Sequence, residues 1–281
     1  MWNLLFITEG DSMFINTNVG AMNASRNLSF NNNAMNKTME KLSSGYRINR
    51  AADDAAGLAI SENMRYQING MTQARRNAND GISLIQTAEG ALTEVHAMLQ
   101  RINTLANQSK NGIYASGDRK KLQLEVNQLK TEISAIAAGT KFNGINLLNT
   151  GSSISFQTGV NNKDVISVSR GNMGLTSLGI ASISISSAGG ASGAISAISA
   201  AIDKVSLQRA KFGAVQNRLE HTINNLGVNI ENLSAAHSRI KDADMAEEMT
   251  TFTKNQILVQ AGTSMLAQAN STPQNVLKLL G

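Results

Sequence analysis

The sequence predicts a mainly α protein, an elongated antiparallel helical bundle or coiled coil formed by the N- and C-terminal arms, with a small β-hairpin region in the middle. Apolar residues recur at coiled-coil spacing over residues 71–138 and again over 195–240. A stretch rich in Ser, Gly and Ile separates these regions. The only proline is Pro273, so no proline interrupts a helix before it. Because neither arm can bury its apolar face alone, the two arms are expected to pair.

The composition limits the chemistry that the chain can perform. Cysteine is absent, which excludes disulfides, thiolate metal sites and cysteine nucleophiles. The net charge is +5, but the basic residues are dispersed, and their densest clusters are Arg75-Arg76 and Arg119-Lys120-Lys121. We therefore predict no nucleic-acid partner. No apolar run approaches the ~20 residues needed to cross a bilayer, so we predict no membrane insertion.

The first long helix is predicted to run from about Ala55 to Ser109. Asp53 and Asp54 precede it as an acidic N-cap, and Asn111-Gly112 would end it. Its apolar seam alternates steps of three and four residues, and Gly81 alone supplies no side chain. The seam consists of Met71, Ala74, Ala78, Gly81, Ile85, Ala88, Leu92, Val95, Leu99, Ile102 and Ala106.

Two further helices repeat this spacing. Asp118 is predicted to cap the second helix and Gly139 to close it. The third helix covers residues 195–240, where Arg209 and Gln216 interrupt the seam and are expected to set its register. The seam of the second helix is Leu122, Val126, Leu129, Ile133 and Ile136. The seam of the third is Ile195, Ile198, Ile202, Val205, Phe212, Leu219, Ile223, Leu226, Ile230 and Leu233.

The middle of the chain, residues 149–193, changes from helical to alternating periodicity. We predict a few short β-strands with a hairpin there, and a flexible connector over 186–193 before the third helix. The apolar residues that alternate with polar ones are Ile154 and Phe156, Val165 and Val168, and Ile183 and Ile185.

The two ends of the chain combine helical apolar spacing with very few charges. Such helices gain little stability alone, so we predict that both ends are disordered in the free chain and helical when packed among copies. Their methionines favour adaptable packing between subunits. The apolar positions are Leu28, Met35, Met39 and Leu42 at one end, and Phe252, Val259 and Leu266 at the other.

No catalytic, cofactor-binding or metal-binding residue is predicted. The adjacent side chains of Asp53 and Asp54 diverge and have no partner base nearby, which favours a helix cap over acid/base catalysis. His96, His221 and His237 lie far apart in the sequence and form no compact ligand pattern.

Several short motifs, in a fixed order, identify a family resemblance. They are Ile15-Asn16-Thr17-Asn18, residues 42–49 (LSSGYRIN), residues 52–60 (ADDAAGLAI), Phe142-Asn143-Gly144, residues 238–244 (SRIKDAD) and residues 276–280 (VLKLL). In this combination the chain resembles bacterial flagellin, the subunit of the flagellar filament. The implied function is a structural subunit that polymerises into the propeller for swimming motility. A hook–filament junction (hook-associated) protein is the alternative, and an enzyme on a helical scaffold is a more distant one.

The resemblance also implies a domain organisation. Residues 13–55 with 241–281 would form an inner terminal coiled-coil domain, and residues 56–194 with 195–240 a surrounding shell domain. The short middle implies that no large outer domain is present. Residues 1–12 precede the start of the family pattern, and they are either a mis-assigned start or a real extension. Their apolar opening lacks the basic region and cleavage site of a signal peptide.

The resemblance implies two sets of site residues. A self-assembly set consists of Leu28, Met35, Leu42, Arg47, Asn49, Asp53, Asp54, Phe252, Val259, Leu266 and Leu279. A second set resembles the site that Toll-like receptor 5 reads, although Asn103-Thr104 replaces the usual charged pair. That set consists of Gln100, Arg101, Leu105 and Glu125.

Export and assembly partners follow from the same resemblance. The chain would leave the cell unfolded through the flagellar type III export apparatus and become part of an extracellular bacterial flagellum. A flagellin export chaperone would first hold the C-terminal segment, about 245–281. Hook-associated and cap proteins would be neighbours of the filament. Whether the Ser/Thr-rich middle carries O-linked glycans is left open.

Overall fold

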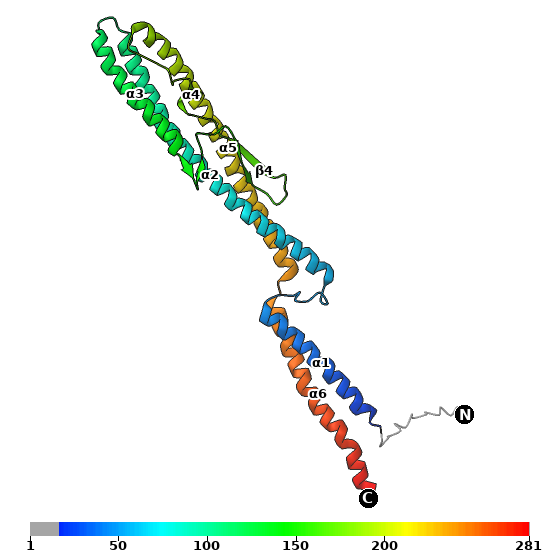
Figure 1. The fold of residues 1–281 in the computed structure, drawn as a ribbon. Helices are drawn as coiled ribbons and strands as arrows, with labels where there is room; N and C mark the ends of the chain where they lie inside the picture. Colours follow the sequence, from blue (N-terminus) through cyan, green and yellow to red (C-terminus); the bar gives the residue numbers. More distant parts are fainter. Residues whose placement is uncertain (1–16, 281) are drawn as a thin grey trace. The chain divides into compact units, whose positions relative to one another are not determined.

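The computed structural model of the chain describes residues 17–280, with side chains described as far as residue 272 (Figure 1). Most of this part is helical, and its β structure consists of four short strands and one isolated bridge. In chain order, the elements are α1 (Val19–Ser44), α2 (Ala55–Lys110), α3 (Ser116–Gly139), β1 (Lys141–Phe142), β2 (Ile145–Asn146), β3 (Ser153–Gln157), β4 (Val165–Ser169), α4 (Leu175–Leu178), α5 (Ala188–Lys241) and α6 (Met245–Leu280).

The chain divides into two compact units. Unit 1 comprises Met1–Met64 and Ala235–Gly281, and unit 2 comprises Arg65–Ser234. Unit 1 is thus built from both ends of the sequence, whereas unit 2 is one continuous segment. The predicted domain boundaries near 55 and 241 fall close to these limits, but the division into an inner and a shell domain stays a prediction.

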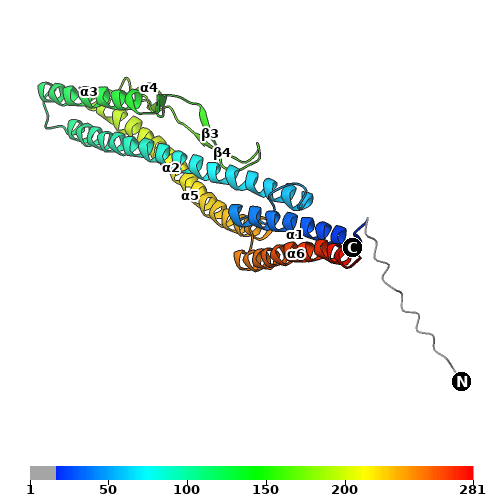
Figure 2. The same ribbon diagram turned by 90° about the horizontal axis from the view of Figure 1, so that it is seen from below.

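Unit 2 is a helical bundle with an aliphatic core. Figures 1 and 2 both show α2, α3 and α5 side by side. Arg101 on α2 pairs with Glu125 on α3 at 2.7 Å between Nη2 and Oε1, and Arg209 on α5 approaches Glu89 on α2 at 3.4 Å. The predicted α2 seam is confirmed between residues 74 and 106, where each of its apolar side chains is fully buried. These side chains are Ala74, Ala78, Ile85, Ala88, Leu92, Val95, Leu99, Ile102 and Ala106.

The predicted hairpin is confirmed as the antiparallel pair β3–β4. Ile154 lies opposite Val168, and Phe156 lies opposite Ile166. The hairpin packs against α2 at Gly81, where an added Cβ would come within 3.2 Å of the Phe156 ring. The gap in the α2 seam is therefore the position at which an aromatic side chain from β3 approaches the helix.

A second, smaller hairpin joins β1 to β2 and was missed in the sequence analysis. Asn143 and Gly144 have positive φ values of 47° and 79°, as a two-residue type I′ turn requires. The Asn-Gly pair was the available signal. Both hairpins are fastened by Arg170, a buried guanidinium at the end of β4. Arg170 donates hydrogen bonds to the backbone carbonyl of Asn146 and to the carbonyl and hydroxyl of Ser152.

The prediction of a strand at Ile183 and Ile185 was wrong. Residues 183–185 have no regular secondary structure and lie between a turn at 181–182 and a bend at 186–187, and the short helix α4 precedes them. The backbone of Ile185 is satisfied by side chains instead of a neighbouring strand. Gln123 of α3 accepts its N–H at 2.6 Å, and Ser109 of α2 donates to its carbonyl. The alternation of Ile183 and Ile185 therefore comes from an irregular segment that packs against α2 and α3, not from a strand.

Two helix starts also differ from the prediction. The tract 186–193 was expected to be a flexible connector, but α5 begins at Ala188 because the Ser187 hydroxyl accepts the N–H of Gly190 at 3.1 Å. The second helix begins at Ser116, and its N-cap is Ala115. Asp118 therefore lies inside the first turn, where its charge still favours the positive end of the helix dipole.

Candidate functional site

The paired helices of unit 1, α1 and α6, form the candidate site. They run antiparallel and lie side by side in both views (Figures 1 and 2). Near the start of α1, the Asn18 side chain donates to the carbonyl of Ala269 at 2.7 Å. Near its end, Lys41 pairs with Glu248 at 2.8 Å. Two polar contacts thus fix the register of the pair.

The seam between α1 and α6 is only partly closed. An added Cβ at Gly262 would lie 3.3 Å from a methyl group of Leu28, so the leucine packs over this glycine. Thr38 and Asn255 are the only residues of the described part of this pair that are fully buried. No apolar side chain of α1, or of α6 up to Thr272, reaches full burial within the chain. The pair therefore has no apolar core of its own.

The outward faces of both helices carry large apolar side chains. Phe30 is the most exposed of them, at 73%. In unit 2, by contrast, a continuous aliphatic cluster is buried. The apolar residues exposed on the pair are Val19, Met22, Phe30 and Met39 on α1, and Met245, Met249, Ile257, Leu258 and Met265 on α6. These side chains are available to neighbouring molecules.

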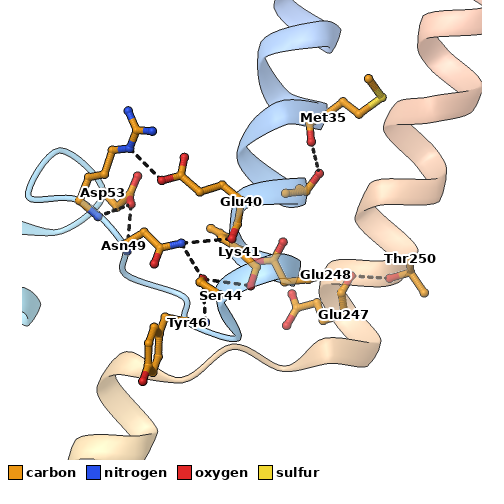
Figure 3. A network of polar contacts seen from close by, with 12 residues as sticks. Met35, Glu40, Lys41, Ser44, Tyr46, Asn49, Asp53, Glu247, Glu248 and Thr250 are labelled. Atoms are coloured by element: carbon orange, nitrogen blue, oxygen red, sulfur yellow. Dashed lines mark hydrogen bonds and ion pairs between the residues drawn. The ribbon is translucent and has the colours of Figure 1, made fainter.

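A polar network closes unit 1 at the end of α1 (Figure 3). Gly45, in the left-handed conformation with φ at 73°, ends the helix by donating its N–H to the carbonyl of Lys41. Tyr46 then forms a β-bridge with Asp242. The N–H of Ala243 donates to the carbonyl of Gly45 at 2.9 Å. The segments that leave α1 and enter α6 therefore bind each other through their backbones.

Lys241 and Arg47 reinforce this closure. Lys241 is buried, pairs with Glu62 at 2.7 Å and lies 5.4 Å from the centre of the Tyr46 ring. Arg47 donates from its guanidinium to the carbonyl of Ile240 and from its backbone N–H to the carbonyl of Lys241. Both cationic side chains therefore bind partners within the same chain.

Two aspartates organise the turn that leads into α2. The confirmed N-cap is Asp54, whose carboxylate accepts the N–H of Gly57 at 2.8 Å. Asp53 accepts from the backbone N–H groups of Arg50, at 3.0 Å, and of Asn49, at 3.2 Å. The hydrogen bond from the Arg50 backbone is the main cause that lowers the pKa of the Asp53 carboxyl. Each carboxylate thus stabilises a local backbone turn.

A second ion pair braces the same turn. Arg50 binds Glu40 at 2.8 Å, and this hydrogen bond raises the pKa of the Arg50 guanidinium. The Asn49 side chain donates to the Ser44 hydroxyl at 2.7 Å and to the Glu40 carbonyl. The turn is therefore connected to the last turn of α1.

The predicted self-assembly residues fall into two groups. Six of them, all apolar, are half-buried on α1 and α6, and this group consists of Leu28, Met35, Leu42, Phe252, Val259 and Leu266. Arg47, Asn49, Asp53 and Asp54 belong to the network around the turn. The side chain of Leu279 lies outside the described residues, as does the whole of the predicted extension 1–12. Sequence reasoning assigned the terminal methionines to packing between subunits but missed the other exposed apolar side chains, such as Phe30, although helical periodicity opposite the seam could have found them.

The predicted receptor residues lie together on unit 2, but not all at the surface. Arg101 and Glu125 form the ion pair between α2 and α3, and Gln100 is exposed within 3.0 Å of His96. Leu105 is only 1% exposed, so any contribution that it makes to a receptor contact would be indirect.

The described residues offer no site for a metal ion. No group of three or more His, Asp or Glu side chains converges among them, and the sequence has no cysteine. Within the same part of the chain, every helix is too short or too polar to cross a membrane.

Two sequence families match this chain over most of its length. The Bacterial flagellin N-terminal helical region matches residues 15–152, and the Bacterial flagellin C-terminal helical region matches residues 195–280. The chain belongs to the flagellin family. It lacks a large outer domain, since the two flagellin regions leave only residues 153–194 between them.

Individual flagellins are similar along nearly the whole chain. Flagellin of Bacillus subtilis is 50% identical over 303 residues, covering 95% of this chain and 100% of that protein. Flagellin of Halalkalibacterium halodurans is 52% identical over 271 residues, with the same coverage of both chains. The Flagellar filament 33 kDa core protein of Treponema phagedenis is 49% identical over 285 residues, again covering 95% of this chain and 100% of that protein. These similarities support the predicted filament subunit.

Solved structures agree with the helical fold. Bacillus cereus flagellin superposes with a TM-score of 0.50 at 32% identity, covering 54% of this chain and 88% of that one. A flagellar hook-associated protein from Vibrio parahaemolyticus gives a TM-score of 0.57 over 68% of this chain and 100% of that one, but its 12% identity shows the fold alone. The junction-protein alternative gains no support beyond this shared fold.

Proposed function

We propose that this flagellin is a structural subunit that polymerises into the bacterial flagellar filament through the exposed faces of α1 and α6. The observation that carries the mechanism is the absence of a buried apolar side chain in the described part of that pair. A helix pair that leaves its largest apolar groups in water is stabilised when further copies cover them.

Contacts between unlike surfaces of the pair would make an open polymer. Phe30 on α1 and Ile257 on α6 are exposed side chains of two different helices, so each helix offers apolar surface to neighbouring copies. When one patch of each copy binds a different patch of the next copy, the copies close into a ring only if the rotations between them add up to a full turn. Such head-to-tail contacts generate helical filaments.

The role requires no catalytic residue and no cofactor, because covering apolar surface is sufficient. We also propose that the subunit is secreted through the flagellar type III export apparatus and functions outside the cell. An export chaperone holding residues 245–281 would keep α6 apart from other copies before export. Hook-associated and cap proteins are the proposed neighbours at the ends of the filament, and Toll-like receptor 5 is a proposed reader of the surface around Arg101 and Glu125.

One substitution on α1 tests the assembly surface. Phe30→Ser removes the most exposed apolar side chain of the pair, and we expect it to abolish growth of filaments from seeds while the circular dichroism of the monomer is unchanged. Leu124→Ser is the matched control, because Leu124 is 66% exposed on α3 in unit 2. Electron microscopy and sedimentation measure the polymer. Normal filaments from Phe30→Ser, or loss of filaments from Leu124→Ser alone, would contradict the proposal.

A further inference from the structure

The exposed methionines of the described chain are confined to one pair of helices. Five methionines are between 47% and 64% exposed, and all five lie on α1 or α6. The other methionines in this part of the chain are half-buried or buried, and three of them lie in unit 2. The exposed set is Met22, Met39, Met245, Met249 and Met265. The remaining set is Met35, Met64, Met71, Met98 and Met173.

Exposure decides how readily a thioether is oxidised. A peroxide transfers one oxygen atom to the sulfur, which loses two electrons and becomes a sulfoxide, while the peroxide is reduced and leaves as water or an alcohol. The product is polar and accepts hydrogen bonds, unlike the apolar thioether that it replaces. Five methionine residues on α1 and α6 are exposed to this reaction, whereas Met173 in unit 2 is only 6% exposed.

We propose that these five methionines form an oxidation site at which peroxides switch off self-assembly of the free subunit. The inference rests on the proposed function, because the same side chains make up more than half of the large exposed apolar groups on the described part of α1 and α6. A sulfoxide placed between two copies would need a hydrogen-bond donor that an apolar neighbour cannot supply.

The surroundings of Met249 illustrate why the modified surface would assemble poorly. Met249 and Ile257 share one exposed strip of α6, together with Thr250, Thr253 and Lys254. The Thr250 and Thr253 hydroxyls already donate to backbone carbonyls of their own helix. The single flexible donor on the strip is therefore Lys254, which prefers to remain hydrated. A copy that covers this strip must remove water from the sulfoxide.

Assembly should in turn protect these methionines from oxidation. If neighbouring copies cover these five sulfur atoms, peroxide reacts with them more slowly in the filament than in the monomer. The half-buried methionines of α2 should show a smaller difference, because their surroundings are set mainly within one chain. The ratio of the two oxidation rates at each methionine thus maps the assembly surface.

The experiment compares the wild-type chain with two leucine variants. The test variant carries M22L, M39L, M245L, M249L and M265L. The matched control carries M64L, M71L and M98L, and both variants keep every other methionine. Each monomer is treated with hydrogen peroxide, the peroxide is destroyed with catalase, and seeded polymerisation is followed by sedimentation. Peptide mass spectrometry reports the sulfoxide at each site.

We expect oxidation to raise the critical concentration of the wild type and of the control by about tenfold or more, as the burial of even one unpaired polar group predicts. The test variant should polymerise as well after peroxide as before. Equal inhibition of the test variant, or unimpaired polymerisation of fully oxidised wild type, overturns the inference.

Two further readouts keep the test decisive. If the test variant does not polymerise untreated, oxidised wild type is instead reduced with methionine sulfoxide reductases of both stereospecificities. Recovery of polymerisation then supports the inference, and continued loss overturns it. Failure of the proposed function looks different, because untreated wild type would not polymerise at all.

Discussion

Single residues decide how closely the elements of unit 2 approach one another. Gly81 interrupts the α2 seam, and a Cβ there would lie 3.2 Å from the Phe156 ring and 3.3 Å from a methyl group of Leu219. Gly90 lies on the same helix, and an added Cβ would meet nothing within 4 Å. The two glycines therefore separate the effect of packing from that of helix propensity.

We predict opposite results for valine at these two glycines. Gly81→Val should lower the free energy of unfolding by about 1–3 kcal/mol, because the new methyl groups overfill a packed contact. Gly90→Val should leave it unchanged or raise it by a few tenths of a kcal/mol, since valine has a better helix propensity than glycine. Urea unfolding measures both values. Equal effects at the two positions would show that Phe156 does not pack over Gly81.

Asp53 gives a residue-scale prediction that depends on pH. Hydrogen bonds from the Arg50 and then the Asn49 backbone favour its charged form, so its pKa in the folded chain is lower than in the unfolded chain. The stabilisation is therefore complete above about pH 5 and is lost as pH falls through the folded pKa, which lies below the ordinary value of about 3.9. Because Asp53 is exposed, the effect on total stability is small.

The Arg50 amide proton is a direct probe of this titration. Its NMR chemical shift should follow the Asp53 carboxylate and show a midpoint below the ordinary aspartate value. In Asp53→Asn that inflection should disappear, while the neutral amide can still accept a hydrogen bond. An unchanged inflection in the variant, or a midpoint above the ordinary value, would refute the assignment.

At the scale of elements, periodicity predicted the long helices and their buried seams. It failed where side chains, and not a neighbouring strand, form the hydrogen bonds of a backbone segment. Ile185 alternates as a strand would, yet Gln123 and Ser109 satisfy its backbone, and neither contact leaves a mark in the local sequence. The Gly-rich start of α5 looked flexible because its cap, Ser187, is one serine among several. Local composition could not identify either case, since tertiary contacts decide the first and the choice of one capping serine decides the second.

The candidate site shows the same limit. Apolar spacing correctly placed helices at both ends of the chain, but most of the positions that it selected, including Leu28 and Val259, lie on the half-buried side of each helix. The opposite side, including Phe30 and Ile257, was not selected, although the same helical periodicity places it opposite the seam. Whether the ends are disordered in the free chain stays a prediction.

Arg170 links the two hairpins and provides a prediction at this scale. Arg170→Lys keeps the charge but cannot reach the carbonyls of Asn146 and Ser152 together, because an ammonium group lacks the planar fork of guanidinium. We expect a loss of about 1–3 kcal/mol in unfolding free energy, because at least one hydrogen bond of the charged guanidinium is left unmade. The Ser152 carbonyl keeps its bond from the Arg170 backbone N–H. Lys163→Arg, in the turn between β3 and β4, is the control and should be neutral. A neutral Arg170→Lys would mean that the hairpins are held by apolar packing alone.

At the scale of the whole molecule, the two units differ in where their apolar groups lie. Unit 2 contains the continuous apolar core, whereas the α1–α6 pair exposes its apolar groups. The two units should therefore differ in what they need from other copies. Unit 2 is expected to be stable in the monomer, and unit 1 to gain most of its stability in the polymer.

A shortened chain, residues 45–244, tests this division of roles. It removes α1 and α6 and retains unit 2 with the adjoining segments. We expect it to unfold cooperatively, with helical circular dichroism, and to form no filaments at concentrations at which the full chain does. Long tubes in electron micrographs would contradict the role given to the terminal helices. Loss of cooperative unfolding would contradict the independence of unit 2.

The contact between Asn18 and Ala269 joins residues 251 positions apart. A chain that is released with its N-terminus first cannot close unit 1 until nearly all of it has emerged. Until then α1 has no partner helix within its own molecule. A prematurely terminated product would lack that partner permanently. Only a chain synthesised as far as α6 can form the helix pair.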